Sequence, residues 1–359
     1  MKSTIRRYVR VLISLSLGVL LLWLIMRGQN TGLILEELQR ANYWWIALAM
    51  LCAILSHFLR AIRWNRLIRT MGYTTSAVQT FYAVMTGYLT NMAVPRMGEI
   101  TRCITLGKAS GTPFNALAGT VVAERVFDFF TLIGIVFLTI ILQFSFLKNF
   151  IFRLFWNPLV EKTADNWLLL AITFFAIAVI IIVVAIVLRN KFSNPKQGSL
   201  IHKIKRQFGG FLNGIKTIKR MRGKGWFILQ SIIIWGLYYL TVYLCFFAIP
   251  ATSHLSPFVG FTLLAVGSLG ILAPVPGGIG TYHFLTIITL TELYSIASEP
   301  ATSYAYITHA TQIIVNLVAG VFSWIMLSVQ SKKSNKVEVQ RKAFVPMDAS
   351  NRNEGSSRQ

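Results

Sequence analysis

Long apolar runs separated by short polar stretches extend along the chain to about residue 330. An α-helix needs about 18 or more mainly apolar residues to cross the hydrocarbon core of a bilayer. Runs of that kind predict full spans at about 9–26, 43–59, 114–143, 166–188, 226–249 and 303–329. Two further apolar stretches, 76–112 and 257–299, are interrupted by Pro and Gly near their middle. The pattern predicts an all-α polytopic transmembrane bundle of about eight membrane segments, including two broken-helix hairpins.

The composition agrees with this class of protein and narrows the domain organisation. Hydrophobic residues make up 55% of the 359 residues and charged residues only 13%, which is unusual for a soluble domain. We expect one membrane domain over residues 1–330, followed by a disordered tail over 331–359 that is rich in Ser, Asn, Lys and Arg. The net charge of +23 would suggest nucleic acid in a soluble protein. Here the basic residues crowd the ends of apolar runs, so we expect no nucleic-acid partner.

The distribution of basic residues predicts the orientation of the chain in the membrane. Lys and Arg are concentrated in the stretch 189–224, which contains no acid, and they also flank the N-terminus and follow residue 330. Cytoplasmic loops carry such an excess, so both termini and this stretch are expected in the cytoplasm. With these orientations, the number of full spans requires that each interrupted stretch begins and ends on the same side of the membrane. We expect 76–112 to enter from the cytoplasmic face and 257–299 from the opposite face.

The interruptions themselves are candidate functional features. A helix that breaks within a bilayer must satisfy its free backbone groups against protein or a water-filled cavity. Paired interruptions in the two halves of a chain are typical of a transporter site near the midplane. We therefore expect the two tips to approach each other inside the bundle. The tip residues are Pro95 and Gly98 in the first hairpin, and Pro274, Pro276, Gly277, Gly278 and Gly280 in the second.

Ionisable residues surround the first tip and continue on the next span. They are Arg96, Glu99, Arg102, Glu124, Arg125 and Asp128. Charged groups at membrane depth are costly and mark a functional site by default. Arg suits bidentate recognition of phosphate, so we expect Arg96 and Arg102 to bind an anionic headgroup, with Glu99 holding one guanidinium. We expect the acids and Arg125 on the next span to face the bundle and pair with this cluster. The structural alternative is that these acids only neutralise the arginines.

Two other polar stripes have weaker functional implications. On the last span His309, Gln312, Asn316 and Ser323 share one face, either as interhelical hydrogen-bonding groups or as part of a site. Arg60, Arg63, Arg66 and Arg69 follow the span 43–59 at three-residue intervals. They predict a helix end whose arginines reach anionic headgroups at the membrane surface.

Most enzymatic chemistry lacks a sequence signal in this chain. The glycines at 277–280 are not followed by Lys-Ser/Thr and do not lie in a strand–helix unit, so a nucleotide site is not expected. The five His are dispersed and the three Cys are isolated, which predicts no metal site, disulfide or cofactor. No Ser/His/Asp arrangement is indicated either. We expect the chain to be no enzyme and to have membrane lipids with anionic headgroups as its partners.

Three motifs in this order resemble a known family. They are Pro95-Arg96-x-Gly98-Glu99-x-x-Arg102, then Glu124-Arg125-x-x-Asp128, and then Pro274-x-Pro276-Gly277-Gly278-Ile279-Gly280. The chain is similar to the transmembrane region of lysylphosphatidylglycerol synthases and to its stand-alone flippase-like relatives, the UPF0104-type membrane proteins. The resemblance implies a multi-pass inner (plasma) membrane protein that moves or handles phospholipids or lipid-linked molecules.

The chain departs from the family pattern in two respects. His283 stands where the family often has an acid just after the Gly-rich motif, and we include it among the candidate substrate-binding residues. No acyltransferase domain follows the last span, so lysyl transfer by this chain alone is not expected.

Three functions are compatible with the sequence. The first is a lipid translocator. The second is a membrane enzyme or enzyme subunit that acts on lipid-linked substrates, in which the carboxylates of the cluster serve as acids and bases. The third is a scaffold for envelope assembly that transports nothing. The sequence does not name the lipid, the direction or energy source of transport, the oligomeric state or a partner enzyme.

Overall fold

The computed structural model describes residues 29–144 and 223–343 apart from 274, together with the isolated positions 16, 20, 23, 27, 146, 148 and 175. Side chains are described as far as residue 330. All regular elements in these ranges are helical, which confirms the predicted fold class. The expected spans 9–26 and 166–188, most of the basic stretch 189–224, the tip residue Pro274 and residues 344–359 of the expected tail lie outside the described residues.

Four helices are long and apolar enough to cross a membrane. They are α3 (Tyr43–Thr70), α6 (Phe114–Leu142), α11 (Lys224–Leu244) with its 3₁₀ continuation η2 (Cys245–Ala248), and α14 (Ser298–Ala343). The short helix α2 (Thr31–Gln39) precedes them, and the Asn30 side chain accepts hydrogen bonds from its first turn. The predicted limits agree within a few residues for α6, α11 and the start of α14, whereas α3 continues well beyond the predicted end at residue 59.

The first hairpin consists of α4 (Ala77–Ala93) and α5 (Gly98–Ser110). Helix α4 ends before Pro95, because a residue preceding proline disfavours the helical conformation. The two arms pack backbone to backbone, and a Cβ added at Gly87 would lie 2.8 Å from the Gly98 carbonyl oxygen. The 17 residues of α4 span about 25 Å, at the short end of what can cross a bilayer core. The two arms therefore form one closely packed hairpin.

The second hairpin consists of α12 (Pro257–Leu272), the short η3 (Pro276–Gly278), α13 (Thr281–Ile288) and the π-helical turn η4 (Thr289–Leu293). Three glycines of its tip have positive φ angles, namely Gly277 (60°), Gly278 (74°) and Gly280 (85°). Residues with a Cβ adopt such angles only with strain, so the glycines of this motif allow the chain to reverse. Behind the tip, Gly270 allows the backbone of α12 to contact that of Tyr282.

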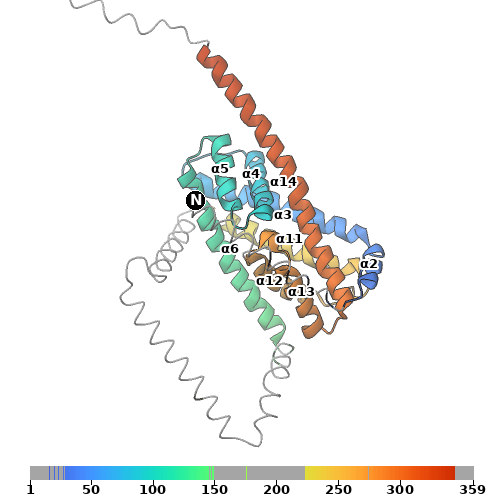
Figure 1. Cartoon of the computed structure of the whole chain (residues 1–359). Helices are drawn as coiled ribbons and strands as arrows, with labels where there is room; N and C mark the ends of the chain where they lie inside the picture. The colour runs from blue at the N-terminus through green and yellow to red at the C-terminus, as the bar shows by residue number, and fades with distance from the viewer. Residues whose placement is uncertain are drawn as a thin grey trace, which may run out of the picture.

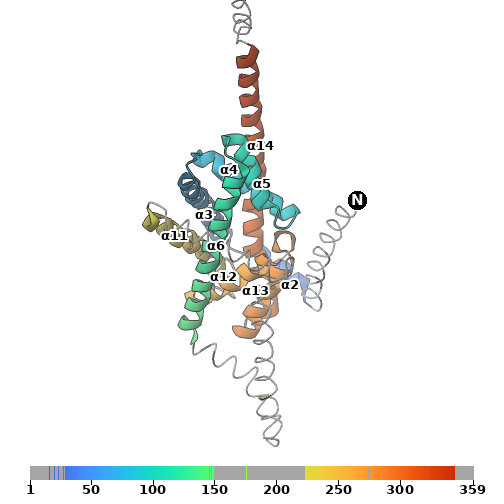
Figure 2. The same ribbon diagram turned by 90° about the vertical axis from the view of Figure 1, so that its left-hand side faces the viewer.

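The two hairpins enter the bundle from opposite ends. The first begins and ends beside the start of α6, whereas Gln143 at the end of α6 donates hydrogen bonds to Phe258 and Thr262 at the start of α12. Figures 1 and 2 show α4 and α5 beside one end of the bundle and α12 and α13 beside the other, with the long α14 passing both. At the tips α4 contacts η3, and Arg96 Nη2 lies 3.5 Å from the Leu272 carbonyl oxygen. The expected approach of the tips is confirmed.

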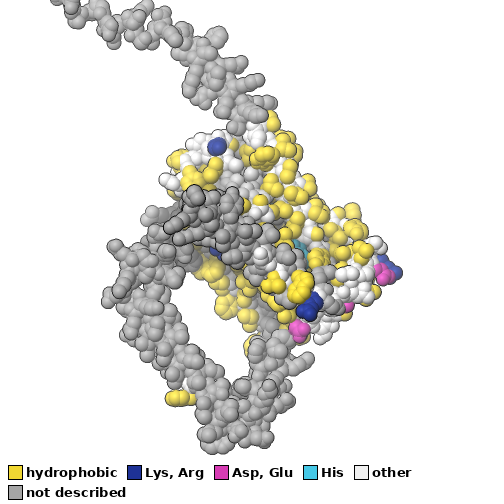
Figure 3. Space-filling model, in the orientation of Figure 1, with side chains coloured by type: hydrophobic (Ala, Val, Ile, Leu, Met, Phe, Trp, Pro, Cys, Tyr) yellow, Lys and Arg dark blue, Asp and Glu magenta, His cyan; other side chains and the backbone are white. Residues whose placement is uncertain are grey.

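The exterior of the described bundle is apolar. In Figure 3 hydrophobic side chains cover most of the described surface, and charged groups appear at only a few places on it. Large apolar side chains such as Ile141 and Val318 are 70% and 64% exposed. Such a surface is stable in hydrocarbon, so the chain is a membrane protein with a helical bundle.

Candidate functional site

Helix α3 carries two arginines into the interior of the bundle. Arg60 and Arg63 are 4% and 0% exposed, and the helix continues beyond them to Thr70. The prediction that these residues mark a helix end at the membrane surface is therefore wrong for both. Trp64, Leu67 and Ile68 are buried on the same segment, so this part of α3 packs against other helices instead of leaving the membrane. Exposed Arg69 is near the true end.

The buried arginines of α3 are neutralised by two carboxylates of α6. Arg60 Nη2 lies 2.8 Å from Glu124 Oε1 and 2.9 Å from Asp128 Oδ2. Arg63 Nη2 donates to Asp128 Oδ1 at 2.6 Å. Residues four apart project from the same face of a helix, so Glu124 and Asp128 face α3 together. The expectation that these acids face the bundle is confirmed, although Asp128 pairs with α3 instead of the first tip.

The Nη1 groups of these two arginines are directed to α11. Arg60 Nη1 donates to the Tyr238 hydroxyl at 3.2 Å, and Arg63 Nη1 donates to the Ser231 hydroxyl at 2.9 Å. The Arg63 guanidinium also lies 5.5 Å from the centre of the Phe227 ring. Sequence reasoning missed this arrangement. The three-residue spacing of the arginines was the available signal, but it was attributed to a helix end.

Arg102 connects the first hairpin to the same carboxylate. Its Nη2 lies 3.0 Å from Glu124 Oε2, and the residue is 3% exposed. The guanidinium stacks 4.7 Å from the centre of the Trp64 ring, and Trp64 Nε1 donates to Thr120 at 2.9 Å. Glu124 thus contacts three arginines from α3 and α5. The expected pairing of Glu124 with the cluster of the first tip is confirmed through Arg102.

A second ion pair between α5 and α6 lies on the outside of the bundle. Arg125 Nη2 is 3.0 Å from Glu99 Oε1, and the two side chains are 43% and 31% exposed. We expected Glu99 to hold Arg96 or Arg102, and this was wrong: its partner is Arg125. Arg125 is the twelfth residue of the 29-residue α6, about 17 Å from its start, so the pair lies well inside the length of this helix.

The connected ion pairs carry more positive than negative charge. Arg60, Arg63 and Arg102 are joined to the two carboxylates of Glu124 and Asp128, and the pair of Arg125 and Glu99 beside them is separate and neutral. Within the described residues, one positive charge is therefore left over. At membrane depth such an excess requires a counter-charge, because the surrounding hydrocarbon does not solvate it.

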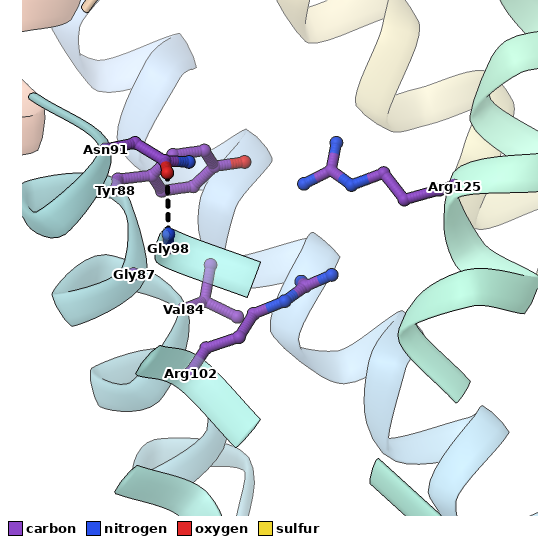
Figure 4. A pocket seen from close by; sticks show the side chains of 7 residues that line it. All are labelled: Val84, Gly87, Tyr88, Asn91, Gly98, Arg102 and Arg125. Carbon is purple, nitrogen blue, oxygen red and sulfur yellow. Dashed lines mark hydrogen bonds between the residues drawn. The ribbon is translucent and has the colours of Figure 1, made fainter. Parts of the chain in front are cut away.

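A small cavity of about 10 Å³ lies between the two hairpin arms and α6. Figure 4 shows the guanidinium groups of Arg102 and Arg125 directed toward the same space from α5 and α6, opposite Tyr88 and Asn91. A cavity of this size holds about one water molecule. Asn91 is occupied by the hairpin itself, since its Oδ1 accepts a 2.6 Å hydrogen bond from the Gly98 amide.

Arg96 occupies the turn of the first hairpin in an unusual backbone conformation. Its φ angle is +64°, a value that costs a residue with a Cβ about 1–3 kcal/mol and often occurs at functional sites. The residue is exposed, and its Nη2 has the 3.5 Å contact with Leu272. Arg96 therefore lies at the junction of the two tips and separate from the buried ion pairs.

Two histidines lie beside the second tip. His309 Nε2 donates to the Gly277 carbonyl at 2.9 Å, and the His283 ring lies 4.6 Å from the His309 ring. The Tyr282 ring stacks on His309 at 4.9 Å. The polar stripe of α14 is thus partly used to hold the broken backbone of the tip. Among the described side chains, no group of three His, Cys, Asp or Glu comes close enough together to bind a metal.

Comparison with known proteins agrees with this architecture. The pattern of the lysylphosphatidylglycerol synthase TM region matches residues 11–320. A UPF0104 membrane protein of Methanocaldococcus jannaschii is 24% identical over 315 residues, which cover 84% of this chain and 90% of the relative. A UPF0104 membrane protein of Pyrococcus horikoshii is 24% identical over 292 residues, or 77% of this chain and 84% of the relative.

Another relative is considerably longer. Glycosyltransferase AglD of Haloferax volcanii is 25% identical over 351 residues, which cover 91% of this chain but only 56% of AglD. No solved structure matches the chain. Because the family pattern covers most of the sequence and includes all three motifs, the chain belongs to the family of the lysylphosphatidylglycerol synthase transmembrane region.

Proposed function

We propose that this protein binds the anionic headgroup of a phospholipid or lipid-linked molecule and moves it within the membrane. The observation that carries the proposal is the surplus positive charge of the buried ion pairs inside the helical bundle. Half-exposed Arg125 lies beside these pairs and lines the same cavity as Arg102. An anionic headgroup would supply the missing counter-charge, and guanidinium groups are well suited to phosphate oxygens.

The hairpins support movement rather than binding alone. The two hairpins enter the bundle from opposite ends, and their tips meet beside Arg96 and Leu272. In transporters, such paired interruptions lie at the substrate site, where one half of the bundle moves against the other. The strained backbone of Arg96 lies at this junction, which is where such a movement would act.

The burial of each arginine refines the site that the sequence predicted. Arg102 is buried and paired with Glu124, whereas Arg96 and Arg125 are exposed. We propose that Arg125 receives the phosphate first, that Arg102 contacts it from the cavity below, and that Arg96 acts at the junction of the tips. In this view the three-arginine contact of Glu124 is the structural support of the site.

The test is reconstitution of the purified protein into vesicles of zwitterionic lipid that contain a trace of fluorescent phosphatidylglycerol. We expect leaflet exchange of the anionic probe to exceed exchange of a matched phosphatidylcholine probe. Arg125→Lys retains the charge but loses the planar fork of donors, so it should slow the exchange while the protein stays folded. The matched control is Arg40→Lys, because Arg40 forms an exposed ion pair with Glu36 outside the cluster. Equal exchange of both probes by wild type, at the rate of empty vesicles, would contradict the proposal.

A second candidate function is suggested by the longer relative. Because a protein named as a glycosyltransferase contains a similar region together with additional sequence, this region could serve an enzyme that acts on lipid-linked substrates. We expect this chain by itself to catalyse no reaction. Chemical turnover of the headgroup in the same vesicles, without movement between leaflets, would favour the enzyme.

A further inference from the structure

The outward-facing ion pair lies in apolar surroundings. Arg125 is flanked along α6 by Val122 and Phe129, which are 47% and 52% exposed. Glu99 is flanked along α5 by Ile100 and Ile104, which are 42% and 43% exposed. A carboxylate and a guanidinium are thus presented on a surface that otherwise suits hydrocarbon, where charges are costly.

This pair is not required to join α5 to α6. The buried contact between Arg102 and Glu124 already connects the two helices, and its side chains are 4% and 0% exposed. Glu99 uses only one of its oxygens for Arg125, and its buried Oε2 has no hydrogen-bond partner among the described residues. A pair formed only for stability would be expected to use both oxygens in a bidentate contact.

The cavity beside the pair contains unused donor capacity as well. Arg102 Nε is buried and has no hydrogen-bond partner within the described part of the chain, and Arg102 lines the cavity together with Arg125. Figure 4 shows both guanidinium groups directed into this space. The two non-bridging oxygens of a phosphodiester would offer one acceptor to each arginine. Glu99 at present engages only Arg125.

On the basis of the proposed function, we propose that the Glu99 carboxylate is a built-in substitute for the phosphate of the substrate. The substrate is a lipid phosphodiester with a single net negative charge, and it enters laterally between α5 and α6 by displacing Glu99 from Arg125. One such charge takes the place of the Glu99 charge at Arg125, one for one. A zwitterionic headgroup carries no net charge with which to replace it.

The dimensions of the site require this displacement. The cavity of about 10 Å³ accepts one water molecule but no phosphate. Glu124 is fully buried between three arginines and cannot move without leaving Arg102 unpaired, because only Arg60 and Arg63 also pair with Asp128. The side chain of Glu99 is 31% exposed and has one partner, so it can release Arg125 while the buried ion pairs stay intact. Glu99 is therefore the group that opens the site.

The test measures binding of phosphatidylglycerol to the full chain in nanodiscs of phosphatidylcholine. Glu99→Gln removes the competing charge, so binding should become tighter by about fivefold, the upper range for an ion pair near the surface. The matched control is Glu36→Gln, which breaks the 2.7 Å pair with Arg40 on α2 and should leave binding unchanged. Phosphatidylcholine serves as the comparison lipid and should gain less affinity from Glu99→Gln.

Soluble glycerol phosphate distinguishes a lipid from a free anion. It should fail to compete at concentrations at which phosphatidylglycerol binds, because lateral entry requires the acyl chains. Effective competition would assign the site to a soluble anion and overturn the lipid part of the proposal.

The remaining outcomes separate this inference from the proposed function. Unchanged or weaker binding by Glu99→Gln, with leaflet exchange by the wild type intact, would overturn the role of Glu99 and leave the function standing. Glu99→Asp, which retains the charge with a shorter reach, should give a smaller gain than Glu99→Gln. If Glu99→Gln does not fold and Glu99→Asp binds no tighter than wild type, Glu99 is structural and the inference is wrong.

Discussion

The two hairpins reach the same depth from opposite ends of the bundle but differ in chemistry. The first contains Arg96, Glu99 and Arg102 and is connected to α6 by ion pairs. The second contains Glu292 as its only Asp, Glu, Lys or Arg between residues 257 and 293. Its tip is held by backbone groups, through glycines with positive φ and the hydrogen bond from His309 to Gly277. The first hairpin is held by charged side chains and the second by its backbone conformation. Removal of a charged side chain should therefore affect the first hairpin much more than the second.

Each hairpin also has its own apolar core. One cluster of buried residues, which includes Trp64, Leu106 and Leu117, lies beside the first hairpin. The other includes Phe246, Ile249 and Tyr304 and lies beside the second. The ion pairs lie next to the first cluster only, because Arg63 and Arg102 stack on aromatic rings within it. Charge is thus buried where aromatic rings and acids surround it.

The largest expected effect is an all-or-none difference in access to the two hairpins. In a chain without its native cysteines, Ser76→Cys precedes the first hairpin and Ser253→Cys precedes the second. A membrane-impermeant thiol reagent added to intact cells should label Ser253→Cys and spare Ser76→Cys, because basic residues predict that Ser76 is cytoplasmic. Labelling of both positions from the same side would contradict the prediction that the two hairpins enter from opposite faces of the membrane.

Loss of charge in the centre of the site should have the next largest effect. Glu124→Ala leaves three buried arginines without this counter-charge, and removing one partner of a buried ion pair costs about 3–5 kcal/mol. We expect a large loss of folded yield and of thermal stability in detergent. Glu292→Ala in the second hairpin should have little effect, since Glu292 is exposed. Similar losses for both substitutions would remove the distinction between the hairpins.

Substitution of a closely packed glycine should destabilise either hairpin, whereas removal of a charge should destabilise only the first. Gly98→Ala places a methyl group against the backbone of Gly87, and Gly270→Ala places one against the backbone of Tyr282. Backbone atoms cannot move aside, so each substitution should cost about 1–3 kcal/mol in the free energy of unfolding. Gly134→Ala, whose Cβ would have no neighbour within 4 Å, is the control and should be neutral in the same thermal unfolding experiment.

The smallest effect on stability is expected at the junction of the tips. Arg96→Lys should change the free energy of unfolding by less than about 0.5 kcal/mol, because the side chain is exposed and has one long contact. The rate of phosphatidylglycerol exchange in vesicles should nevertheless fall, since lysine lacks the fork of donors. An unchanged rate would assign Arg96 to the turn alone.

The hairpins could be predicted from the sequence because the number of spans and the charge of the loops are properties of whole segments. They do not depend on which side chains meet. The sequence predicted the pairing of Glu124 less completely. Burial of Arg60 and Arg63 depends on α3 continuing past residue 59, and a run of arginines resembles a membrane boundary when only hydropathy is considered. Only the packing of α3 against α6 and α11 reveals the partners of these arginines. The partner of Glu99 was missed for a similar reason, because adjacent motifs do not specify which side chains meet.

The adjacency of Glu124 and Arg125 limits changes in the length of α6. Successive residues of an α-helix project about 100° apart, so the carboxylate faces the interior while its neighbour faces outward. Deletion of one residue between Pro113 and Glu124 would rotate the rest of the helix by that angle. The guanidinium would then replace the carboxylate among the buried arginines and bring a fourth cation into the interior. The number of residues between the loop at Pro113 and this dipeptide is therefore fixed by electrostatics.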